Sequence, residues 1–439
     1  MKKLNIETYG CQMNIADSEV VASILAEHFE ITENQKEADL ILLNTCSVRD
    51  NAEQRIRKRL RELGSLKKKK STLIIGLLGC MAERVKEQLL TEEKALDFIA
   101  GPDAYRSLPQ LIEEASKGNL SFNVLLSEEE TYDDIAPVRY DGNGISAFIP
   151  IMRGCNNFCS YCIVPYTRGR ERSRDPKTII QEATQLFESG YKEITLLGQN
   201  VNSYLWKEDE SSLDFADLIE KMALISPLLR VRFATSHPKD ISDKLIYTIA
   251  KYPNICKYIH LPVQSGSTAV LKKMNRVYNR EYYLERIRTI KNVIPDIALS
   301  TDILSGFCGE TEQDHQDTLS IMKTVEFSSA FMFRYSVREG TKAAEKFEDD
   351  VPDEVKARRL EEIIALQQEL SLENNKKDIG KVFEVLVEGV SKRSDKKMYG
   401  RTSQNKVCVF PREETKVGDY IHVNVIHCTA GTLLAEIVQ

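Results

Sequence analysis

Three cysteines stand close together near the middle of the chain, in the segment Arg153-Gly-Cys-Asn-Asn-Phe-Cys-Ser-Tyr-Cys162. Their spacing is Cys-x3-Cys-x2-Cys, and such a loop can wrap a cube of iron and sulfide and supply three thiolates. A [4Fe–4S] cluster has four irons, so one iron stays open to a small chelating molecule. S-adenosylmethionine, with an amino and a carboxylate group side by side, suits that position. One electron would then break its sulfonium bond and release a 5′-deoxyadenosyl radical.

A zinc site and a disulfide are the ordinary alternatives for this loop. Structural zinc usually has four protein ligands, yet no fourth cysteine or histidine is near, and His237 and His260 are distant in sequence. Disulfides are typical of secreted chains, whereas the N-terminus leads straight into a strand pattern with no targeting segment. The ligand count therefore favours the iron–sulfur site. We also expect a cytoplasmic protein without a membrane span.

Residues 1–120 alternate apolar runs with helical patterns, which predicts a parallel, flavodoxin-like sheet with helices on both faces. Strands are expected at residues 4–9, 40–44, 73–78 and 98–99, and helices at 17–29, 51–66, 82–90 and 104–116. Cys11, Cys46 and Cys80 follow the first three strands. Because the carboxyl ends of parallel strands meet at one edge, these cysteines predict a second [4Fe–4S] cluster with an open iron. The alternative is three small buried side chains.

A linker and a second alternating segment come next. Residues 121–146 are acidic and irregular, as expected of a linker. Within residues 147–376, strands are expected at 147–152, 193–197, 230–235, 258–261, 298–303 and 330–335, and a helix at 353–376. Six βα units predict a partial (β/α)6 barrel, whose chemistry lies at the carboxyl ends of its strands. The cysteine loop follows the first of these strands, as this rule requires.

Four residues near the cysteine loop or at the barrel strands are candidate contacts for S-adenosylmethionine. Tyr161 could pack against the adenine, and Gly198 and Gln199 could contact the methionine end. Asp302 could bind a ribose hydroxyl. The ordinary alternatives are a space-filling aromatic, a turn glycine and a helix N-cap.

Residues 377–439 switch to an alternation of period two, which predicts a small β-barrel. Its strands are expected at 382–388, 406–410, 420–426 and 434–438. Cys408 and Cys428 lie here and, like Cys256 and Cys308, lack ligand spacing. We expect these four cysteines to be structural.

The charge is distributed unevenly. The formal net charge is −6, so composition alone does not suggest nucleic-acid binding, but Lys and Arg gather in blocks at residues 55–70, 168–174 and 392–401. Each block could be a solvated face, and together they make a local electrostatic footprint plausible. The candidate substrate contacts are Arg168, Arg338, Lys396, Lys397 and Arg401. Arg338 could hold a carboxylate or a phosphate with two hydrogen bonds.

Short motifs along the whole chain resemble those of the methylthiotransferase family. They are Thr8-Tyr-Gly-Cys-Gln-Met-Asn14, Asn44-Thr-Cys-Ser-Val-Arg49, Gly79-Cys80, Gly154-Cys-Asn-x-x-Cys-x-x-Cys162, Val164-Pro-Tyr-Thr-Arg-Gly169, Leu197-Gly-Gln-Asn-Val-Asn202, Ser236-His-Pro238, Leu261-Pro-Val-Gln-Ser-Gly-Ser267 and Gly400-Arg-Thr402. The resemblance implies an N-terminal methylthiotransferase domain, a radical S-adenosylmethionine core and a C-terminal TRAM domain that binds RNA. The versions Tyr-Gly-Cys-Gln-Met-Asn, in the first motif, and Pro-Tyr-Thr-Arg-Gly, in the motif at 164–169, are similar to the branch of the family that acts on tRNA.

This branch implies a reaction, cofactors and partners. The reaction is methylthiolation of C2 of N6-isopentenyl(dimethylallyl)adenosine at position 37 of tRNA, with two S-adenosylmethionine molecules and with sulfur held at the second [4Fe–4S] cluster. The expected partners are the tRNA anticodon stem-loop, an electron donor of the flavodoxin or ferredoxin type, and a sulfur carrier or sulfide source. We expect a monomer.

Three other functions remain open. The first is the same chemistry on an aspartate of a ribosomal protein, against which the Tyr-Gly-Cys-Gln-Met-Asn and Pro-Tyr-Thr-Arg-Gly segments count. The second is the related reaction on threonylcarbamoyl-adenosine. The third is a non-catalytic iron–sulfur module for RNA binding or electron transfer, which cleavage of S-adenosylmethionine would eliminate.

Overall fold

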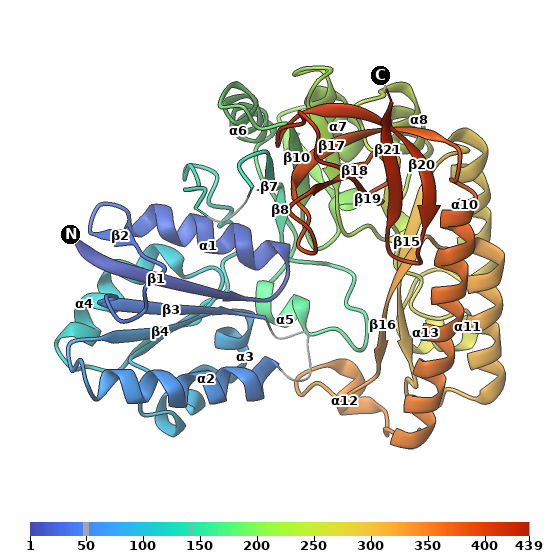
Figure 1. The fold of residues 1–439 in the computed structure, drawn as a ribbon. Coiled ribbons are helices and arrows are strands. Elements are labelled where there is room, and N and C mark those ends of the chain that lie inside the picture. The colour runs from blue at the N-terminus through green and yellow to red at the C-terminus, as the bar shows by residue number, and fades with distance from the viewer. Residues whose placement is uncertain (47–51, 141–142, 439) are drawn as a thin grey trace.

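The computed structural model describes residues 1–46, 52–140 and 143–438 (Figure 1). Residues 47–51, 141–142 and 439 lie outside the described part. The end of the predicted 44–49 motif, the first residue of the predicted helix 51–66 and two residues of the predicted linker therefore lie outside it too. No helix in the described ranges is both long enough and apolar enough to span a bilayer.

The N-terminal part is a parallel sheet of six strands in the order β2-β1-β3-β4-β5-β6, which contains the flavodoxin-like order 2-1-3-4-5. The strands are β1 (Lys2–Tyr9), β2 (Phe29–Ile31), β3 (Leu40–Thr45), β4 (Ile74–Gly79), β5 (Phe98–Ala100) and β6 (Ser121–Asn123). The helices are α1 (Gln12–Leu25), α2 (Ala52–Lys67), α3 (Cys80–Glu92) and α4 (Leu108–Ser116), with a short 3₁₀ turn, η1 (Tyr105–Ser107). The predicted parallel α/β sheet is confirmed.

Two edge strands of this sheet differ from the expectation. Phe29 begins β2, although the apolar period had predicted that it ends a helix; α1 stops at Leu25 instead. Ser121–Asn123 forms β6, although it was assigned to the linker. Both strands have three residues, too few for an alternation of period two to be recognised.

The central part has six parallel strands in two sheets of three, with the orders β13-β10-β7 and β14-β15-β16. The strands are β7 (Ser146–Pro150), β10 (Glu193–Leu197), β13 (Arg230–Phe233), β14 (Tyr258–His260), β15 (Ala298–Ser305) and β16 (Ser329–Arg334). A bridge between Val231 and Ile255 joins the segments at the seam. One apolar cluster runs through both sheets and their helices, so the predicted partial barrel is confirmed.

Most helices of this part cover the outside of the barrel (Figure 1). The helices of this part are α6 (Pro176–Glu188), α7 (Phe215–Ala223), α8 (Asp243–Lys251), α9 (Thr268–Lys273), α10 (Arg280–Val293), α11 (Glu312–Val325), α12 (Lys342–Lys346) and α13 (Asp353–Lys376), with the 3₁₀ turns η2 (Val201–Ser203) and η3 (Pro238–Asp240). The cysteine loop lies between β8 (Met152–Arg153) and the short helix α5 (Val164–Arg168), which is followed by β9 (Arg172–Ser173). A hairpin of β11 (Leu205–Glu208) and β12 (Ser211–Asp214) completes the core.

The C-terminal part is a closed barrel in the order β17-β18-β19-β21-β20. Its strands are β17 (Val382–Val390), β18 (Lys397–Thr402), β19 (Val407–Pro411), β20 (Tyr420–Cys428) and β21 (Leu433–Val438). The predicted small β-barrel is confirmed, with one strand more than expected. Strand β18 was missed because its charged residues and Gly400 obscure the alternation.

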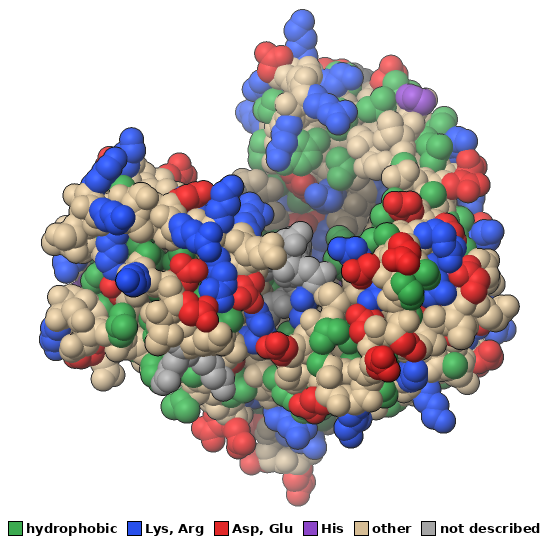
Figure 2. Space-filling model, turned by 90° about the horizontal axis from the view of Figure 1, so that it is seen from below, with side chains coloured by type: hydrophobic (Ala, Val, Ile, Leu, Met, Phe, Trp, Pro, Cys, Tyr) green, Lys and Arg blue, Asp and Glu red, His purple; other side chains and the backbone are tan. Residues whose placement is uncertain are grey.

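Three side chains seat this barrel on the core through main-chain oxygens. Arg230 donates to the carbonyl of Arg401 at 2.7 Å, and Arg232 donates to the carbonyl of Thr402, also at 2.7 Å. In the opposite direction, the Tyr420 hydroxyl of the barrel shares its proton between two carbonyls of the core, those of Lys192 and Leu228. Figure 2 shows a hollow between the N-terminal part, on the left, and the part that projects at the top, with Lys and Arg side chains on both rims.

Candidate functional site

The cysteine loop is held in a tight turn at the carboxyl side of the first barrel strand. Gly154 has a φ of 78°, and a Cβ atom there would lie 1.9 Å from the carbonyl oxygen of Arg170. The Cys155 amide donates to Gly169 at 3.1 Å and the Cys162 amide to Cys159 at 2.9 Å. The chain around the three cysteines is therefore fixed by backbone contacts, and only glycine fits at its entry.

The three thiols of the loop lie in a poorly solvated environment. Burial raises the pKa of Cys155 to about 11 and that of Cys162 to about 12. Cys159 is buried, and Nη1 of the buried Arg276 donates to its sulfur at 3.3 Å. Neutral buried thiols are poor nucleophiles, whereas a bound metal removes their protons outright. The donor set fits a metal cluster better than a covalent catalyst.

The other three cysteines lie where β1, β3 and β4 end. Cys11 is the N-cap of α1, Cys46 follows β3, and Cys80 is the first residue of α3. The Cys46 amide donates to the carbonyl of Tyr9 at 3.0 Å, which holds the ends of β1 and β3 together. Gly79 has a φ of 89° and makes the sharp turn into α3. The structure thus brings all three cysteines to one sheet edge, as expected.

The electrostatics of this second trio differ from those of the loop. The hydrogen bond with the Cys46 thiol is the main cause that lowers the pKa of the Cys11 thiol to about 6, and the guanidinium of Arg168 adds to it. Burial raises the pKa of Cys80, and Arg168 acts against this rise. Three soft sulfur donors with a cationic neighbour fit an anionic iron–sulfur cluster.

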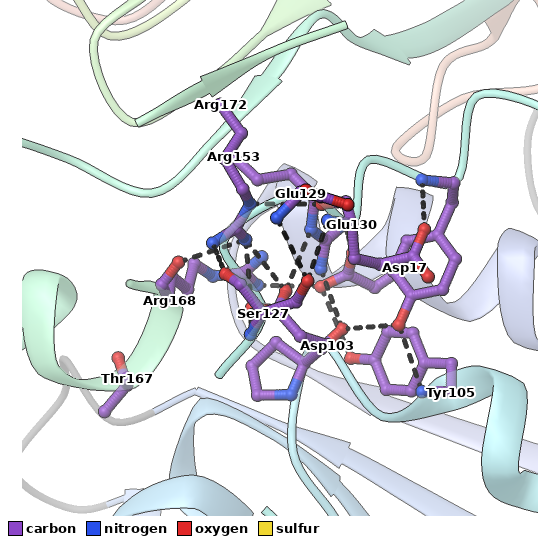
Figure 3. A network of polar contacts seen from close by, with 12 residues as sticks. Asp17, Asp103, Tyr105, Ser127, Glu129, Glu130, Arg153, Thr167, Arg168 and Arg172 are labelled. Atoms are coloured by element: carbon purple, nitrogen blue, oxygen red, sulfur yellow. Dashed lines mark hydrogen bonds and ion pairs between the residues drawn. The ribbon is translucent and has the colours of Figure 1, made fainter. Parts of the chain in front are cut away.

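Arg168, a candidate substrate contact, makes its contacts inside the protein instead. Only 3% of its surface is exposed. Its Nε donates to the Cys80 sulfur at 3.1 Å. Its Nη2 donates to Asp17 at 2.7 Å, and both of these residues are labelled in Figure 3. Arg172 and Arg174 are buried as well, so the block at 168–174 is largely an internal set of ion pairs and not an open basic surface.

The candidate contacts for S-adenosylmethionine lie among buried polar groups. Tyr161 packs edge-on against Phe307, with ring centroids 6.3 Å apart. A Cβ at Gly198 would meet the Met152 side chain at 2.5 Å, so the backbone approaches closely there. Oε1 of Gln199 is buried and has no hydrogen-bond partner among the described residues.

Several neighbouring polar atoms at the same strand ends also lack a partner within the described part of the chain. They are Oδ1 of Asn200, both amide atoms of Asn202, and the hydroxyls of Ser236 and Ser305. Buried polar atoms without partners are rare in native proteins and indicate a missing polar ligand. This mouth therefore fits a small zwitterionic cofactor.

The inner face of the second half of the barrel carries groups that the sequence did not reveal. Nε2 of His260 lies 3.3 Å from Oδ1 of Asp302, and its Nδ1 lies 2.8 Å from the Ser300 hydroxyl. The ring of Phe331 meets His260 edge-on at 5.7 Å and is 57% exposed. On the opposite face of β16, Met332 packs into the core. The sequence of β16, Ser-Ala-Phe-Met-Phe-Arg, has consecutive apolar residues, so it did not distinguish the exposed Phe331 from the packed Met332.

The remaining candidate contacts lie in two places. Arg338 follows β16 and lines a cavity of about 620 Å³ together with Cys46. Lys396 and Lys397 are exposed on the C-terminal barrel, away from the cysteines in the chain fold. Arg401 is half-buried and pairs with Glu388 at 3.1 Å.

Three family models match the chain. The model described as "Uncharacterized protein family UPF0004" matches residues 3–101, the Radical SAM superfamily matches residues 149–322, and the TRAM domain matches residues 376–438. The three matches follow one another along the chain and correspond to the parallel sheet, the partial barrel and the closed barrel.

Relatives match over nearly the whole chain. A tRNA-2-methylthio-N(6)-dimethylallyladenosine synthase of Amoebophilus asiaticus is 57% identical, over 99% of this chain and 92% of the relative. A protein of the same name from Phocaeicola vulgatus is 56% identical, over 99% of this chain and 96% of the relative.

Among solved structures, the radical S-adenosylmethionine methyltransferase TsrM of Kitasatospora setae, with cobalamin and a [4Fe–4S] cluster bound, is similar with a TM-score of 0.58. The match covers 78% of this chain and 77% of TsrM, at 13% sequence identity. The S-adenosylmethionine radical enzyme OxsB gives a TM-score of 0.51 over 84% of this chain and 56% of OxsB, at 12% identity. At such identities the likeness concerns the fold alone.

Proposed function

Because this chain belongs to the family of tRNA-2-methylthio-N(6)-dimethylallyladenosine synthases, we propose that it transfers a methylthio group to C2 of N6-isopentenyl(dimethylallyl)adenosine at position 37 of tRNA. The observation that carries the proposal is the pair of three-cysteine sites, one on the parallel sheet and one on the radical S-adenosylmethionine barrel. A C2–H bond of adenine resists acid–base activation, which explains the need for a radical from one site, while the second site would hold the sulfur.

The six cysteines would hold the two clusters. Cys155, Cys159 and Cys162 would ligate a [4Fe–4S] cluster that leaves one iron for S-adenosylmethionine, and the trio of Cys11, Cys46 and Cys80 would ligate a second. When bound, these groups supply a 5′-deoxyadenosyl radical and hold the sulfur to be transferred, with two S-adenosylmethionine molecules consumed.

The protein's own groups bind and orient the cofactor. Gln199 and the unpartnered amides and hydroxyls beside it would accept and donate hydrogen bonds to the amino acid end of S-adenosylmethionine. Gly198 would contact that end through its backbone, Tyr161 would border the adenine, and Asp302 would accept from a ribose hydroxyl.

The substrate base would enter the barrel beside Phe331. Bases of single-stranded RNA loops are read by stacking on aromatic rings and by edge contacts. Phe331 and Phe333 are 57% and 48% exposed on β16, on the side away from α13. His260 lies next to Phe331 and offers polar atoms for the edge of a purine. An extruded adenosine with an apolar isopentenyl group suits this mixed surface.

Phe331→Ala is expected to weaken binding of an isopentenylated anticodon stem-loop by about 1–3 kcal/mol, roughly 5- to 150-fold, because one stacking platform is lost. The measurement is fluorescence anisotropy with saturating S-adenosylmethionine. Phe122→Ala, which removes an exposed ring from the N-terminal sheet, is the matched control and should bind normally. Equal affinities for all three proteins would refute this placement of the base.

The C-terminal barrel would grip the tRNA backbone. Its exposed lysines Lys396 and Lys397 stand on the same barrel as Arg401, whose charge is shared with Glu388. Cations on a small β-barrel contact phosphates, and each such contact releases a counterion. Arg338, on the wall of the cavity beside Cys46, would contact a phosphate nearer the reaction.

Replacing Lys396 and Lys397 together with alanine is expected to make the slope of log K against log salt less negative by about 2, where K is the association constant for tRNA. Each phosphate contact contributes about 1 to the magnitude of that slope. Titrations of tRNA at several potassium chloride concentrations would measure the slope. Lys221→Ala/Lys323→Ala, on the outer helices of the core, removes the same charge as a control. An unchanged slope in the barrel variant would contradict the proposed contacts.

The domain division and the partners follow from this function. The domains would be a methylthiotransferase domain at 1–120, a linker at 121–146, the radical core at 147–376 and the TRAM domain at 377–439. The reaction requires an electron donor, of the flavodoxin or ferredoxin class, and a sulfur carrier or sulfide source. Bulk tRNA is cytoplasmic, so the protein would act there, as a monomer.

Nucleoside analysis by mass spectrometry tests the function directly. Bulk tRNA from cells with and without this gene would be digested and compared. Loss of 2-methylthio-N6-isopentenyladenosine, with accumulation of N6-isopentenyladenosine, is the expected result. An unchanged nucleoside would refute the substrate and direct attention to threonylcarbamoyl-adenosine and to ribosomal proteins.

A further inference from the structure

A buried network of charges joins the N-terminal sheet to the barrel. Asp17 of α1 is 0% exposed, and it accepts hydrogen bonds from Arg153 at 2.8 Å and from Arg168 at 2.7 Å (Figure 3). Arg172 donates to both oxygens of Asp103 at 2.9 Å, and Arg153 lies 3.5 Å from Asp103. Arginines of the barrel segment thus meet carboxylates of the sheet domain.

The charges within this network do not balance. Three guanidinium groups, those of Arg153, Arg168 and Arg172, share the two carboxylates of Asp17 and Asp103. An uncompensated buried cation is strongly unfavourable. A further negative group beside these direct ion pairs would therefore stabilise them.

Arg168 is the arginine that reaches such a group. Its Nε donates to the Cys80 sulfur, and its Nη1 is buried without a hydrogen-bond partner among the described residues. A free guanidinium N–H next to a ligand sulfur is placed to donate to a second anionic sulfur atom, such as a cluster sulfide. The missing negative charge is thus expected on the Cys80 side.

Arg168 also belongs to the segment that follows the other cysteine trio. It is the last residue of α5, and α5 packs against α3, which begins at Cys80. A residue in the chain just beyond Cys162 therefore contacts the sulfur of a cysteine in the other trio.

We propose that Arg168 is a positioning residue that raises the reduction potential of the cluster held by Cys11, Cys46 and Cys80 and fixes that cluster to the barrel. The inference rests on the proposed function, which assigns a cluster to these cysteines. Reduction adds one electron from an external donor and makes the cluster more negative. Hydrogen bonds to the sulfurs and a nearby positive charge stabilise that state and raise the potential.

The first trio provides an internal comparison. Arg276 donates to the Cys159 sulfur at 3.3 Å and to the carbonyl of Pro262 at 2.8 Å, and it donates to no carboxylate in the part of the chain that the structure describes. Each trio thus has one sulfur in contact with one buried arginine. A change at Arg168 should act on one cluster and a change at Arg276 on the other.

The test is an anaerobic redox titration of the reconstituted full chain, followed by electron paramagnetic resonance without tRNA. A background with Cys155, Cys159 and Cys162 replaced by alanine isolates the second cluster. In that background, Arg168→Gln is expected to shift the midpoint to a more negative potential, and Arg168→Lys, which keeps the charge, to shift it less. Arg276→Gln in the same background should leave it unchanged.

An Arg168→Gln protein that holds its iron and keeps the wild-type midpoint would overturn the proposal. If Arg168→Gln does not retain the cluster, Arg168→Lys decides: a wild-type midpoint with full iron content would also overturn it, and a negative shift would support it. The proposed function fails in a different way, since the unmodified chain would then hold no second cluster at all.

Discussion

Replacing Cys11, Cys46 and Cys80 together with alanine is expected to reduce methylthiolation below detection while cleavage of S-adenosylmethionine continues. The three sulfurs would be the ligands of the proposed cluster at the edge of the N-terminal sheet, where β1, β3 and β4 end. Without them no cluster can hold sulfur there, whereas the loop of the barrel keeps its own three thiols. Iron content should fall by about half, from two clusters to one.

The measurement pairs two products in one reaction: 5′-deoxyadenosine and the methylthiolated nucleoside. The matched control replaces Cys155, Cys159 and Cys162, and that variant should lose both products. A second control, Cys408→Ala, changes a buried cysteine in the core of the C-terminal barrel and should keep both. Full methylthiolation by the first variant would sink the two-cluster scheme.

Asp17→Asn is expected to destabilise the contact between the sheet domain and the barrel by about 3–5 kcal/mol, because it leaves Arg153 and Arg168 buried without their shared carboxylate. A lower denaturant midpoint would report the loss. Glu30→Gln removes one partner of the exposed Lys3–Glu30 pair and should leave the midpoint unchanged. A wild-type midpoint for Asp17→Asn would mean that the network does not hold the domains.

This contribution depends on pH with a definite sign. Burial alone would raise the pKa of Asp17, but Arg153 and Arg168 outweigh it and hold the pKa below its ordinary value. A carboxylate with a lowered pKa in the folded state stabilises the protein above its unfolded pKa of about 3.9, and this stabilisation is lost as the pH falls through the folded value. The stability difference between wild type and Asp17→Asn should therefore be constant near neutral pH and shrink below about pH 4.

The positions of the cysteines could be predicted because they depend on local order. Strands that alternate with helices make a parallel sheet, and residues just after those strands share one edge whatever the loops between them contain. Cys11, Cys46 and Cys80 satisfy that rule. The long helix Asp353–Lys376 was likewise predicted, from its richness in Glu and Leu, and it has the predicted bounds.

The role of Arg168 could not be predicted, because its partners are remote in sequence. It is separated from Cys80 by 88 positions and from Asp17 by 151. In the chain it stands among alternating arginines that resemble an RNA-binding surface. Arg168 and Arg172 find their carboxylates only where the two domains dock, and no periodicity in the sequence shows which arginine will be paired with a buried carboxylate.

The seat of the C-terminal barrel has a consequence for how such proteins diverge. Arg230 and Arg232 donate to carbonyl groups at the end of β18, and main-chain oxygens are the same whichever side chain is attached to them. Substitutions can therefore change the outward side chains of the barrel, and the hydrogen bonds that orient the barrel on the core are kept. A library randomised at those outward positions could retune which RNA loops are accepted, at little risk to assembly.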